Sequence, residues 1–364
     1  MTRTLRSALL LIVILTLAET TTFLRAAMTP ERLAALPAGV AAPTLPADFA
    51  DPSSGPITLY FTDHSLEPGD GPDSHLAAAI DAARVSVDVA AYEFELWSLR
   101  DALIGAHRRG LAVRLVAEAD NADSPEMQAL VAAGIPLVTD GPEGLMHDKF
   151  VIIDRQQVWM GSMNYTFTGA YRNDENLIAI TSREAAAAYL AEFEEMFVGG
   201  RFGAFSPAGG PVSLSLEAAP LEIRFSPDDG VAARIIELIN GARESIHFMA
   251  FSFTSDPIGD AMLAHSAAGM TVTGIFDESQ YNSNGASSEF DRMLENGLAV
   301  RLDGNPDKLH AKVIIIDGEI VIAGSYNFSA SAEEANDENV VIIFSEEIAR
   351  AFLREWERIW EEAE

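Results

Sequence analysis

The feature that most constrains this chain is a set of polar residues that occurs twice at a fixed spacing. The segment 147–154 reads HDKFVIID, and the segment 310–317, which begins 163 positions later, reads HAKVIIID. At the same spacing GSMN at 161–164 is followed by GSYN at 324–327, and NDEN occurs both at 173–176 and at 336–339. So many polar identities at one spacing indicate a duplicated structural unit. We therefore expect two related lobes.

Both copies of the unit read as alternating strands and helices. Segments rich in β-branched and aromatic residues are predicted strands, and these are 86–92, 112–116, 245–251 and 271–276. Segments with apolar residues at helical spacing are predicted helices, and these are 75–84, 99–109, 231–243 and 258–267. This alternation predicts an α/β fold in which each lobe is a mixed β-sheet flanked by helices.

Each copy also ends in a predicted amphipathic helix. Its aromatic residues recur at helical spacing and are expected to pack in the core; they are Tyr189, Phe193, Phe197, Phe352, Trp356 and Trp360. Residues 199–220 are rich in Gly, Pro and Ala and are predicted to be a linker. The predicted lobes are therefore 57–198 and 221–364.

The first 27 residues are predicted to be a signal peptide or an N-terminal anchor. Arg3 and Arg6 precede an uncharged apolar run, residues 7–18, which has the length of a signal-peptide core and is short for a membrane span. We expect export to the periplasm or the extracellular space. An uncleaved anchor through residues 7–18 and an ordinary buried helix are the alternatives. Residues 28–56 carry several prolines among alanines and are predicted to be a spacer.

The charge and the lack of cysteine exclude several classes of function. The chain has 55 acidic and 24 basic residues, a formal charge of -31, which repels nucleic acid and anionic bilayers at long range. A general role in coating nucleic acid is therefore disfavoured. The absence of cysteine removes disulfides, thiolate nucleophiles and zinc sites that need sulfur. Any nucleophile must be another side chain.

The distribution of lysine indicates an anion site. The chain has only three lysines, and two of them, Lys149 and Lys312, occupy the same place in the repeat, two residues after a histidine. Alternation along an extended segment puts each lysine on the same face as its histidine. An imidazole and a compact ammonium at the mouth of a buried strand predict an anionic ligand, and phosphate is the simplest candidate. The third lysine, Lys308, has no lysine counterpart in the first copy and no predicted role.

The pattern H-x-K-x4-D followed by G-S-x-N, present twice, resembles the phospholipase D superfamily of phosphodiesterases. The resemblance extends over about residues 57–361 and implies two lobes related by a pseudo-twofold axis, with both motifs in one central site. It implies that one histidine attacks phosphorus to give a covalent phosphohistidine, while the other protonates the leaving group and then activates water. We assign His147 as the nucleophile and His310 as the general acid and base, and the symmetry leaves the reverse assignment open.

The resemblance also implies roles for the other repeated residues. Side chains that would cradle the phosphoryl oxygens are Lys149, Lys312, Asn164 and Asn327. Glu175 and Glu338 would each accept the second N–H of an imidazole. The hydroxyl groups of Ser162 and Ser325 are expected to hydrogen-bond within the site as part of the phosphate-binding set.

Asp154 and Asp317 complete the catalytic motif of the family. They are expected to be structural or orienting residues, because they lie at strand ends, five positions after the lysines. No metal or other cofactor is expected, since two lysines already offset the charge of a phosphate.

The repeated residues indicate a phosphodiester but not the groups attached to it. The leading hypothesis is hydrolysis of a phospholipid head group by a protein in peripheral contact with a membrane. Two motifs in one chain make a monomer sufficient for a complete site. The alternatives are an exported endonuclease acting on DNA or RNA, a phosphatidyltransferase of the cardiolipin synthase type, and a scaffold without activity. The segment from Glu278 to Ser288 is predicted to be a loop, which either borders the entrance to the site or is a solvated connection.

Overall fold

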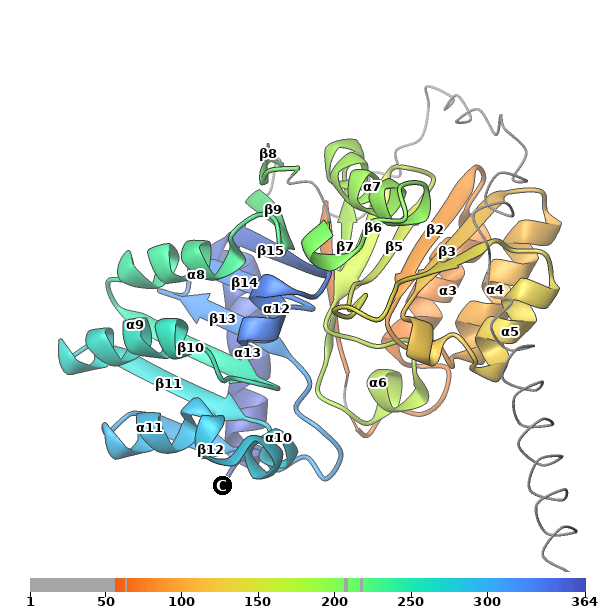
Figure 1. Ribbon diagram of the computed structural model, residues 1–364. Coiled ribbons are helices and arrows are strands. Elements are labelled where there is room, and N and C mark those ends of the chain that lie inside the picture. Colours follow the sequence, from red (N-terminus) through yellow and green to blue (C-terminus); the bar gives the residue numbers. More distant parts are fainter. Residues whose placement is uncertain (1–55, 63, 206–208, 217–218) are drawn as a thin grey trace, which may run out of the picture. The chain divides into compact units, whose positions relative to one another are not determined.

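The computed structural model describes residues 56–62, 64–205, 209–216 and 219–364 (Figure 1). The predicted signal peptide or anchor, residues 1–27, lies outside these ranges, and so does nearly all of the predicted spacer. Within them, no helix combines the length and the apolar character needed to cross a membrane.

The first lobe is built on a seven-stranded mixed sheet with the strand order β1-β7-β6-β5-β2-β3-β4. Strands β2, β3 and β4 are parallel, and the other neighbours are antiparallel. The strands are β1 (Ile57–Phe61), β2 (Ser86–Ala91), β3 (Ala112–Ala117), β4 (Leu137–Thr139), β5 (Lys149–Ile153), β6 (Gln157–Gly161) and β7 (Asn176–Thr181). The helices are α3 (Pro72–Ala82), α4 (Trp97–Arg108), α5 (Pro125–Ala132), α6 (Phe167–Tyr171) and α7 (Arg183–Phe197).

The second lobe repeats this arrangement and adds one edge strand, with the order β12-β11-β10-β13-β14-β15-β9-β8. Its strands are β8 (Val212–Ser215), β9 (Pro220–Ser226), β10 (Ser245–Ala250), β11 (Thr271–Phe276), β12 (Ala299–Leu302), β13 (Lys312–Ile316), β14 (Ile320–Gly324) and β15 (Glu338–Phe344). Its helices are α8 (Val231–Asn240), α9 (Asp256–Ala267), α10 (Glu278–Asn284), α11 (Glu289–Glu295), α12 (Ala330–Glu334) and α13 (Glu346–Glu362). The predicted pair of α/β lobes is confirmed.

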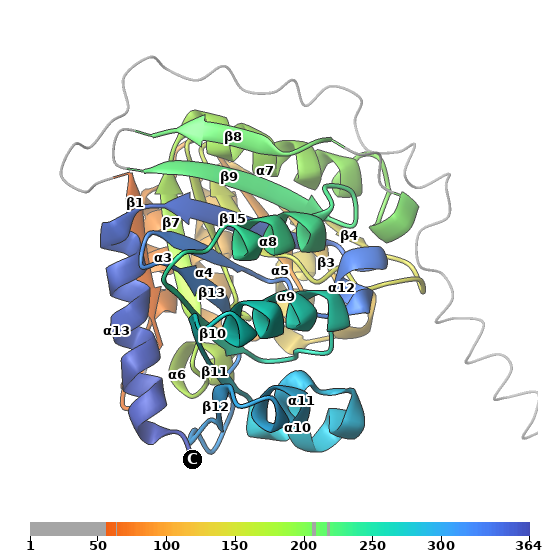
Figure 2. The same cartoon turned by 90° about the vertical axis from the view of Figure 1, so that its left-hand side faces the viewer.

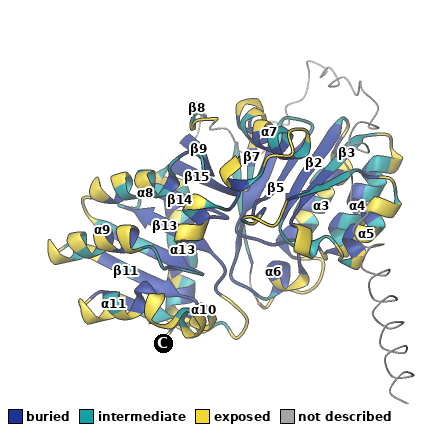
Figure 3. Ribbon diagram, viewed as in Figure 1, coloured by how far each residue is buried: buried dark blue, intermediate teal, exposed yellow. Residues whose placement is uncertain are grey.

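Helices cover both faces of each sheet (Figures 1 and 2). Helices α3, α4 and α5 pack on one face of the first sheet, and α8, α9 and α11 pack on one face of the second. A third core contains apolar residues of both sheets together with helices α7 and α13. The strands are largely buried, while the outward faces of the helices are exposed (Figure 3). Burial on both faces explains why β5 and β13 are continuous apolar runs after their lysines.

The predicted helices at the ends of the two copies are α7 and α13, and their core packing is confirmed. Tyr189, Phe193 and Phe352 are fully buried, and Trp356 is 7% exposed. The indole of Trp356 also donates a hydrogen bond to the carbonyl oxygen of Phe248, at 3.1 Å. These helices therefore join the two lobes through a shared apolar core.

Two segments differ from the sequence prediction. The predicted linker 199–220 contains strand β8 and the first residue of β9, which extend the second sheet. The predicted loop from Glu278 to Ser288 is mainly helix α10 followed by a 3-10 turn over Gly285–Ser287. The helix forms because the carboxylate of Asp277 caps it, accepting the backbone N–H of Gln280 at 2.7 Å.

Candidate active site

Backbone hydrogen bonds between the lobes bring the two histidine segments into one site. The N–H of His147 donates to the carbonyl oxygen of Asp337 at 3.0 Å, and the N–H of His310 donates to that of Asp174 at 3.0 Å. Isolated bridges join the same segments, between Met146 and Asp337 and between Asp174 and Leu309. The segment before each histidine therefore lies against the segment that carries a glutamate of the other lobe.

Each histidine is hydrogen-bonded to the glutamate of the opposite lobe. His147 Nδ1 lies 2.7 Å from Oε2 of Glu338, and His310 Nδ1 lies 2.8 Å and 2.9 Å from the two carboxylate oxygens of Glu175. All four side chains are buried. An ionised carboxylate can only accept, so beside it Nδ1 carries the proton and the lone pair of Nε2 is left for substrate in the neutral imidazole. Burial raises the pKa of Glu175 to about 8, and the charges of Lys312 and Lys149 oppose this shift.

Further polar groups hold these glutamates in place. Ser325 Oγ donates to Oε2 of Glu338 at 2.6 Å, and Asn336 Nδ2 donates to its Oε1 at 3.3 Å. In the first lobe Asn173 Nδ2 donates to Oε1 of Glu175 at 3.3 Å. The glutamate carboxylates are thus fixed before substrate binds.

The two serines hydrogen-bond within the site, as the sequence predicts. Ser162 and Ser325 are fully buried, and their hydroxyl groups accept the backbone N–H groups of Asn176 and Asn339, both at 3.0 Å. Their hydrogen bonds are made with the glutamates and with the start of the following strand. These contacts help to position the glutamates, and a role of the serines in binding phosphate stays a prediction.

The two lysines of the repeat are buried beside the histidines. Lys149 and Lys312 are 1% and 2% exposed, and each Nζ donates to the carbonyl oxygen of its own histidine, at 2.7 Å from His147 and 2.6 Å from His310. An ammonium group has three donors, so this contact leaves donors for a ligand. Burial lowers the pKa of Lys149 to about 8 and that of Lys312 to about 7. A bound anion would oppose this effect and favour the charged ammonium groups.

An aromatic ring packs against each histidine and lysine, a role that was not predicted from the sequence. The ring centroids of Tyr92 and His147 lie 4.6 Å apart, and those of Phe251 and His310 lie 4.5 Å apart. The same two rings lie 4.8 Å and 4.7 Å from the lysine Nζ atoms. The available signal was that both predicted strands of the repeat, 86–92 and 245–251, end in an aromatic residue.

The two asparagines of the repeat are held differently. Asn164 Nδ2 donates to Oε2 of Glu93 at 2.7 Å. In both Asn164 and Asn327 the buried Oδ1 atom has no hydrogen-bond partner within the described residues. Glu93 was not predicted, because the repeat places Ser252 at the corresponding position and so gave no signal.

Asp154 and Asp317 lie at the opposite ends of β5 and β13 from the lysines. The carboxylate of Asp154 accepts backbone N–H groups of Arg84, Val85 and Ser86 at 2.7 to 3.1 Å. Asp317 repeats this arrangement in the second lobe. These hydrogen bonds connect the turns after β5 and β13 to the starts of the neighbouring strands β2 and β10, which agrees with a structural role.

Burial controls the protonation of the histidines. It lowers the pKa of His147 to about 4, with Glu338 opposing the shift and Lys149 adding to it. Burial, followed by the charges of Lys312 and Lys149, holds the pKa of His310 well below its usual value. These shifts favour the neutral imidazole in both histidines. Within the described ranges, no group of three or more His, Cys, Asp or Glu side chains is arranged to hold a metal ion.

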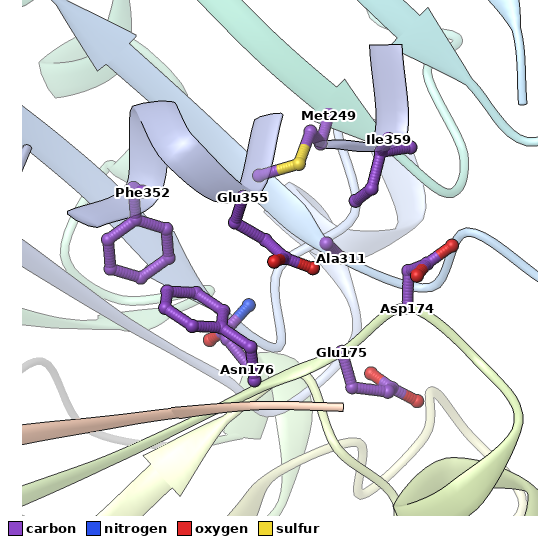
Figure 4. Close-up of a pocket in the computed structure, with 9 residues that line it drawn as sticks. Asp174, Glu175, Asn176, Met249, Ala311, Phe352, Glu355 and Ile359 are labelled. Atoms are coloured by element: carbon purple, nitrogen blue, oxygen red, sulfur yellow. The ribbon is translucent and has the colours of Figure 1, made fainter. Parts of the chain in front are cut away.

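A small pocket lies beside Glu175 (Figure 4). Its lining includes Glu175 and Asn176 from the first lobe and Ala311 and Phe352 from the second. At the positions that correspond to these last two residues, the first lobe has Asp148 and Tyr189, and both contact Asn339. Larger polar side chains thus take the corresponding positions on the other side, and the pseudo-symmetry of the interior is incomplete.

Known proteins with similar sequences show which family this chain resembles. A family model described as cardiolipin synthase, PLD-like domain, matches residues 76–197 and again residues 235–360. A phospholipase D of Rickettsia bellii (strain RML369-C) is 36% identical over 132 residues, which are 36% of this chain and 65% of that protein. The mitochondrial cardiolipin hydrolase of Homo sapiens is 33% identical over 134 residues, 37% of this chain and 52% of that protein. The chain thus spans less than two thirds of the length of these relatives.

The phosphatidylserine synthase of Haemophilus influenzae Rd KW20 has a similar structure, with a TM-score of 0.62. The match is 13% identical and covers 80% of this chain and 84% of that one, so it bears on the fold alone. The family model, in contrast, matches both lobes and includes both histidine-lysine motifs. The chain therefore belongs to the PLD-like family that this model describes, within the phospholipase D superfamily.

Proposed function

We propose that this protein hydrolyses the head-group phosphodiester of a phospholipid through a covalent phosphohistidine. The observation that carries the proposal is the pair of buried histidines, each with Nδ1 fixed by a glutamate of the other lobe and with a buried lysine beside it. This arrangement supplies two imidazoles with free Nε2 atoms and two cations for one phosphate.

In the first step Nε2 of His147 attacks phosphorus and forms a P–N bond, while the P–O bond to the leaving alcohol breaks. His310 gives its Nε2 proton to the leaving oxygen. In the second step the neutral His310 takes a proton from water, the hydroxide attacks phosphorus, and the P–N bond breaks. The products are an alcohol and a phosphomonoester, and both histidines return to their starting states.

The surroundings of the histidines fit these roles. The nucleophile must be neutral, and burial keeps His147 neutral near pH 7. The general acid must be protonated, and the negative charge of a bound phosphodiester raises the pKa of the nearby imidazole. Glu338 and Glu175 stabilise the positive charge that develops on each histidine, and Lys149 and Lys312 stabilise the charge on the phosphoryl oxygens.

Two features support a lipid as the substrate. The relatives named above are a phospholipase D and a cardiolipin hydrolase. The net charge of -31 opposes the approach of a polyanion more than that of a zwitterionic lipid. Export across a membrane, which the sequence predicts, would bring the protein to such a surface. An alcohol in place of water at the second step would give a phosphatidyltransferase with the same residues.

The test is hydrolysis by the purified protein of phosphatidylcholine vesicles and, separately, of plasmid DNA, in the presence of excess chelator. We expect release of choline by the wild type and a loss of at least about 10³-fold in rate for both His147→Ala and His310→Ala. Full activity in either variant would contradict the mechanism. Rapid nicking of DNA with no release of choline would contradict the lipid substrate.

A further inference from the structure

The two lobes differ in charge where the repeat reaches the edge of the site. Tyr92 and Phe251 both pack on a histidine, so the residues that follow them, Glu93 and Ser252, occupy corresponding positions. Lys308 lies two residues before His310, and the residue two before the other histidine is Leu145. At the first pair of positions only the first lobe carries a charge, the carboxylate of Glu93. At the second pair only the second lobe carries one, the ammonium group of Lys308.

Glu93 is held beside the phosphate-binding asparagine of the first lobe. It is partly buried, and its Oε2 accepts Nδ2 of Asn164 at 2.7 Å. Ser252 in the second lobe instead accepts Nδ2 of Asn284, at 3.3 Å. A negative charge therefore lies next to the asparagine of the first lobe, where the second lobe has a neutral hydroxyl.

Lys308 is exposed and lies near the histidine of the second lobe. Its Nζ is 5.6 Å from the ring of Phe251, which is itself 4.5 Å from the ring of His310. The backbone is fixed there, since its carbonyl oxygen accepts the N–H of Asp174 at 2.8 Å. Within the part of the chain that the structure describes, no carboxylate forms an ion pair with Lys308. Burial raises the pKa of the Asp277 carboxyl, and the charge of Lys308 is among the effects that oppose this rise. The corresponding Leu145 is also exposed, at 36%.

The protonation of neighbouring groups agrees with this placement. Burial and the charges of nearer groups lower the pKa of His310, and Lys308 lowers it further by a smaller amount. Burial lowers the pKa of Lys149, and Glu93 is among the carboxylates that oppose this shift. Both charges are thus close enough to act on the central site.

We propose that Glu93 and Lys308 orient the substrate, so that the protein prefers a phosphodiester with one further anionic group on the side of the second lobe. The group on the side of the first lobe is then neutral or cationic, because an anion there would be repelled by Glu93. This inference rests on the proposed function, since it takes the scissile phosphate to lie between His147 and His310.

The arrangement favours a lipid over a nucleic acid. A nucleic acid strand carries phosphates on both sides of the scissile one, so Lys308 would attract one neighbour while Glu93 repelled the other. A phospholipid whose head group bears a second phosphate has its extra charge on one side only. The chemistry that Lys308 would recognise is thus a single terminal phosphate in the head group.

Two soluble substrates test the role of Lys308 without a membrane. Water-soluble short-chain forms of phosphatidylglycerophosphate and phosphatidylglycerol differ by one phosphate on the leaving alcohol, and both release the same short-chain phosphatidic acid. For each variant the quantity measured is the ratio of kcat/KM for the phosphorylated substrate to that for the other. We expect Lys308→Leu, which copies Leu145, to lower this ratio by about five- to tenfold at low salt, and Lys308→Arg to retain it.

The matched control is Arg350→Leu, which also removes one exposed positive charge, on helix α13. It should leave the ratio unchanged. An equal fall in this control, or no fall in Lys308→Leu, would overturn the proposal. If the wild type hydrolyses neither substrate, the proposed function fails; if it hydrolyses both at equal kcat/KM, this inference alone fails.

The lipid assignment needs a second comparison. Vesicles of phosphatidylglycerophosphate and of phosphatidylglycerol differ by a terminal phosphate in the head group. We expect the wild type to prefer the former and Lys308→Leu to lose that preference. Glu93→Gln, which keeps an acceptor for Asn164, should raise kcat/KM for a single-stranded oligonucleotide severalfold. Dependence on Lys308 for the oligonucleotide but not for the vesicles would overturn the choice of a lipid.

Discussion

At the scale of residues, each histidine is completed by a glutamate from the other lobe. His147 is bonded to Glu338, and His310 to Glu175. The sequence identified all four residues through the repeat, but it did not show which glutamate serves which histidine. Within one copy, histidine and glutamate are nearer in the sequence than the partners that the structure brings together. The crossed pairing depends on contacts between the lobes, which a repeat in the sequence does not encode.

The crossed pairing predicts a large effect of Glu338→Gln on activity. A glutamine can donate to Nδ1 and so favour the wrong tautomer of His147, and it cannot stabilise a positive imidazole. We expect kcat to fall by about 10² to 10⁴-fold, with little change in melting temperature. The control is Glu334→Gln, an exposed residue of helix α12, which should retain wild-type kcat. A loss of less than tenfold in Glu338→Gln would contradict the role of this carboxylate.

We expect a substitution of Asp317 to change the stability of the fold rather than the rate of the reaction. Burial alone would raise the pKa of Asp317, but the N–H groups of Glu244, Ser245 and Arg243 outweigh it and lower the pKa. Because the pKa is lower in the folded state, the stabilisation is complete above the unfolded value of about 3.9 and is lost as pH falls through the folded value. Asp317→Ala should lower the free energy of unfolding by about 2 kcal/mol at pH 7.

Denaturant unfolding at several pH values measures both effects. The difference in stability between wild type and Asp317→Ala should shrink as pH falls below about 4. Activity per folded molecule should remain within a few-fold of wild type at pH 7. A loss of kcat as large as that expected for the histidine variants would instead place Asp317 in the chemistry.

At the scale of elements, the glycine of each G-S-x-N segment ends a strand against a neighbouring carbonyl group. A Cβ atom added at Gly324 would lie 2.0 Å from the carbonyl oxygen of Asn339, and one at Gly161 would lie 2.2 Å from that of Asn176. Each glycine thus allows the strand that follows or contains the glutamate, β7 or β15, to lie close beside the strand that ends in the glycine, β6 or β14. The sequence predicted most strands well because their apolar runs are local, and it missed helix α10 because that helix depends on a polar cap.

Gly324→Ala should therefore disturb both folding and activity. The methyl group would force β14 and β15 apart next to Glu338, so we expect a loss of about 1 to 3 kcal/mol in the free energy of unfolding. The bond between Glu338 and His147 should weaken as well, lowering kcat. Chemical denaturation and steady-state kinetics measure the two effects. Gly209→Ala, where an added Cβ meets no atom within 4 Å, is the control and should change neither.

At the scale of the whole molecule, two copies of one unit form a site that neither copy completes alone. The duplication could be identified from the sequence, and with it the pair of lobes and most of the central residues. The roles of the residues that break the symmetry could not be predicted. Glu93, Lys308 and the pocket beside Ala311 depend on contacts that form only when the chain is folded. These departures from symmetry also give the two histidines different surroundings, which unequal roles require.

The most direct test of the central claim is to trap the covalent intermediate. Bis(p-nitrophenyl) phosphate has a leaving group that needs no proton, so His310→Asn should still release about one equivalent of p-nitrophenol and then stop. Mass spectrometry of the quenched protein should find the p-nitrophenyl phosphoryl group on the peptide that contains His147, and His147→Asn should give neither burst nor adduct. An adduct on His310 would reverse the assigned roles, and the absence of an adduct from both variants would contradict covalent catalysis by histidine.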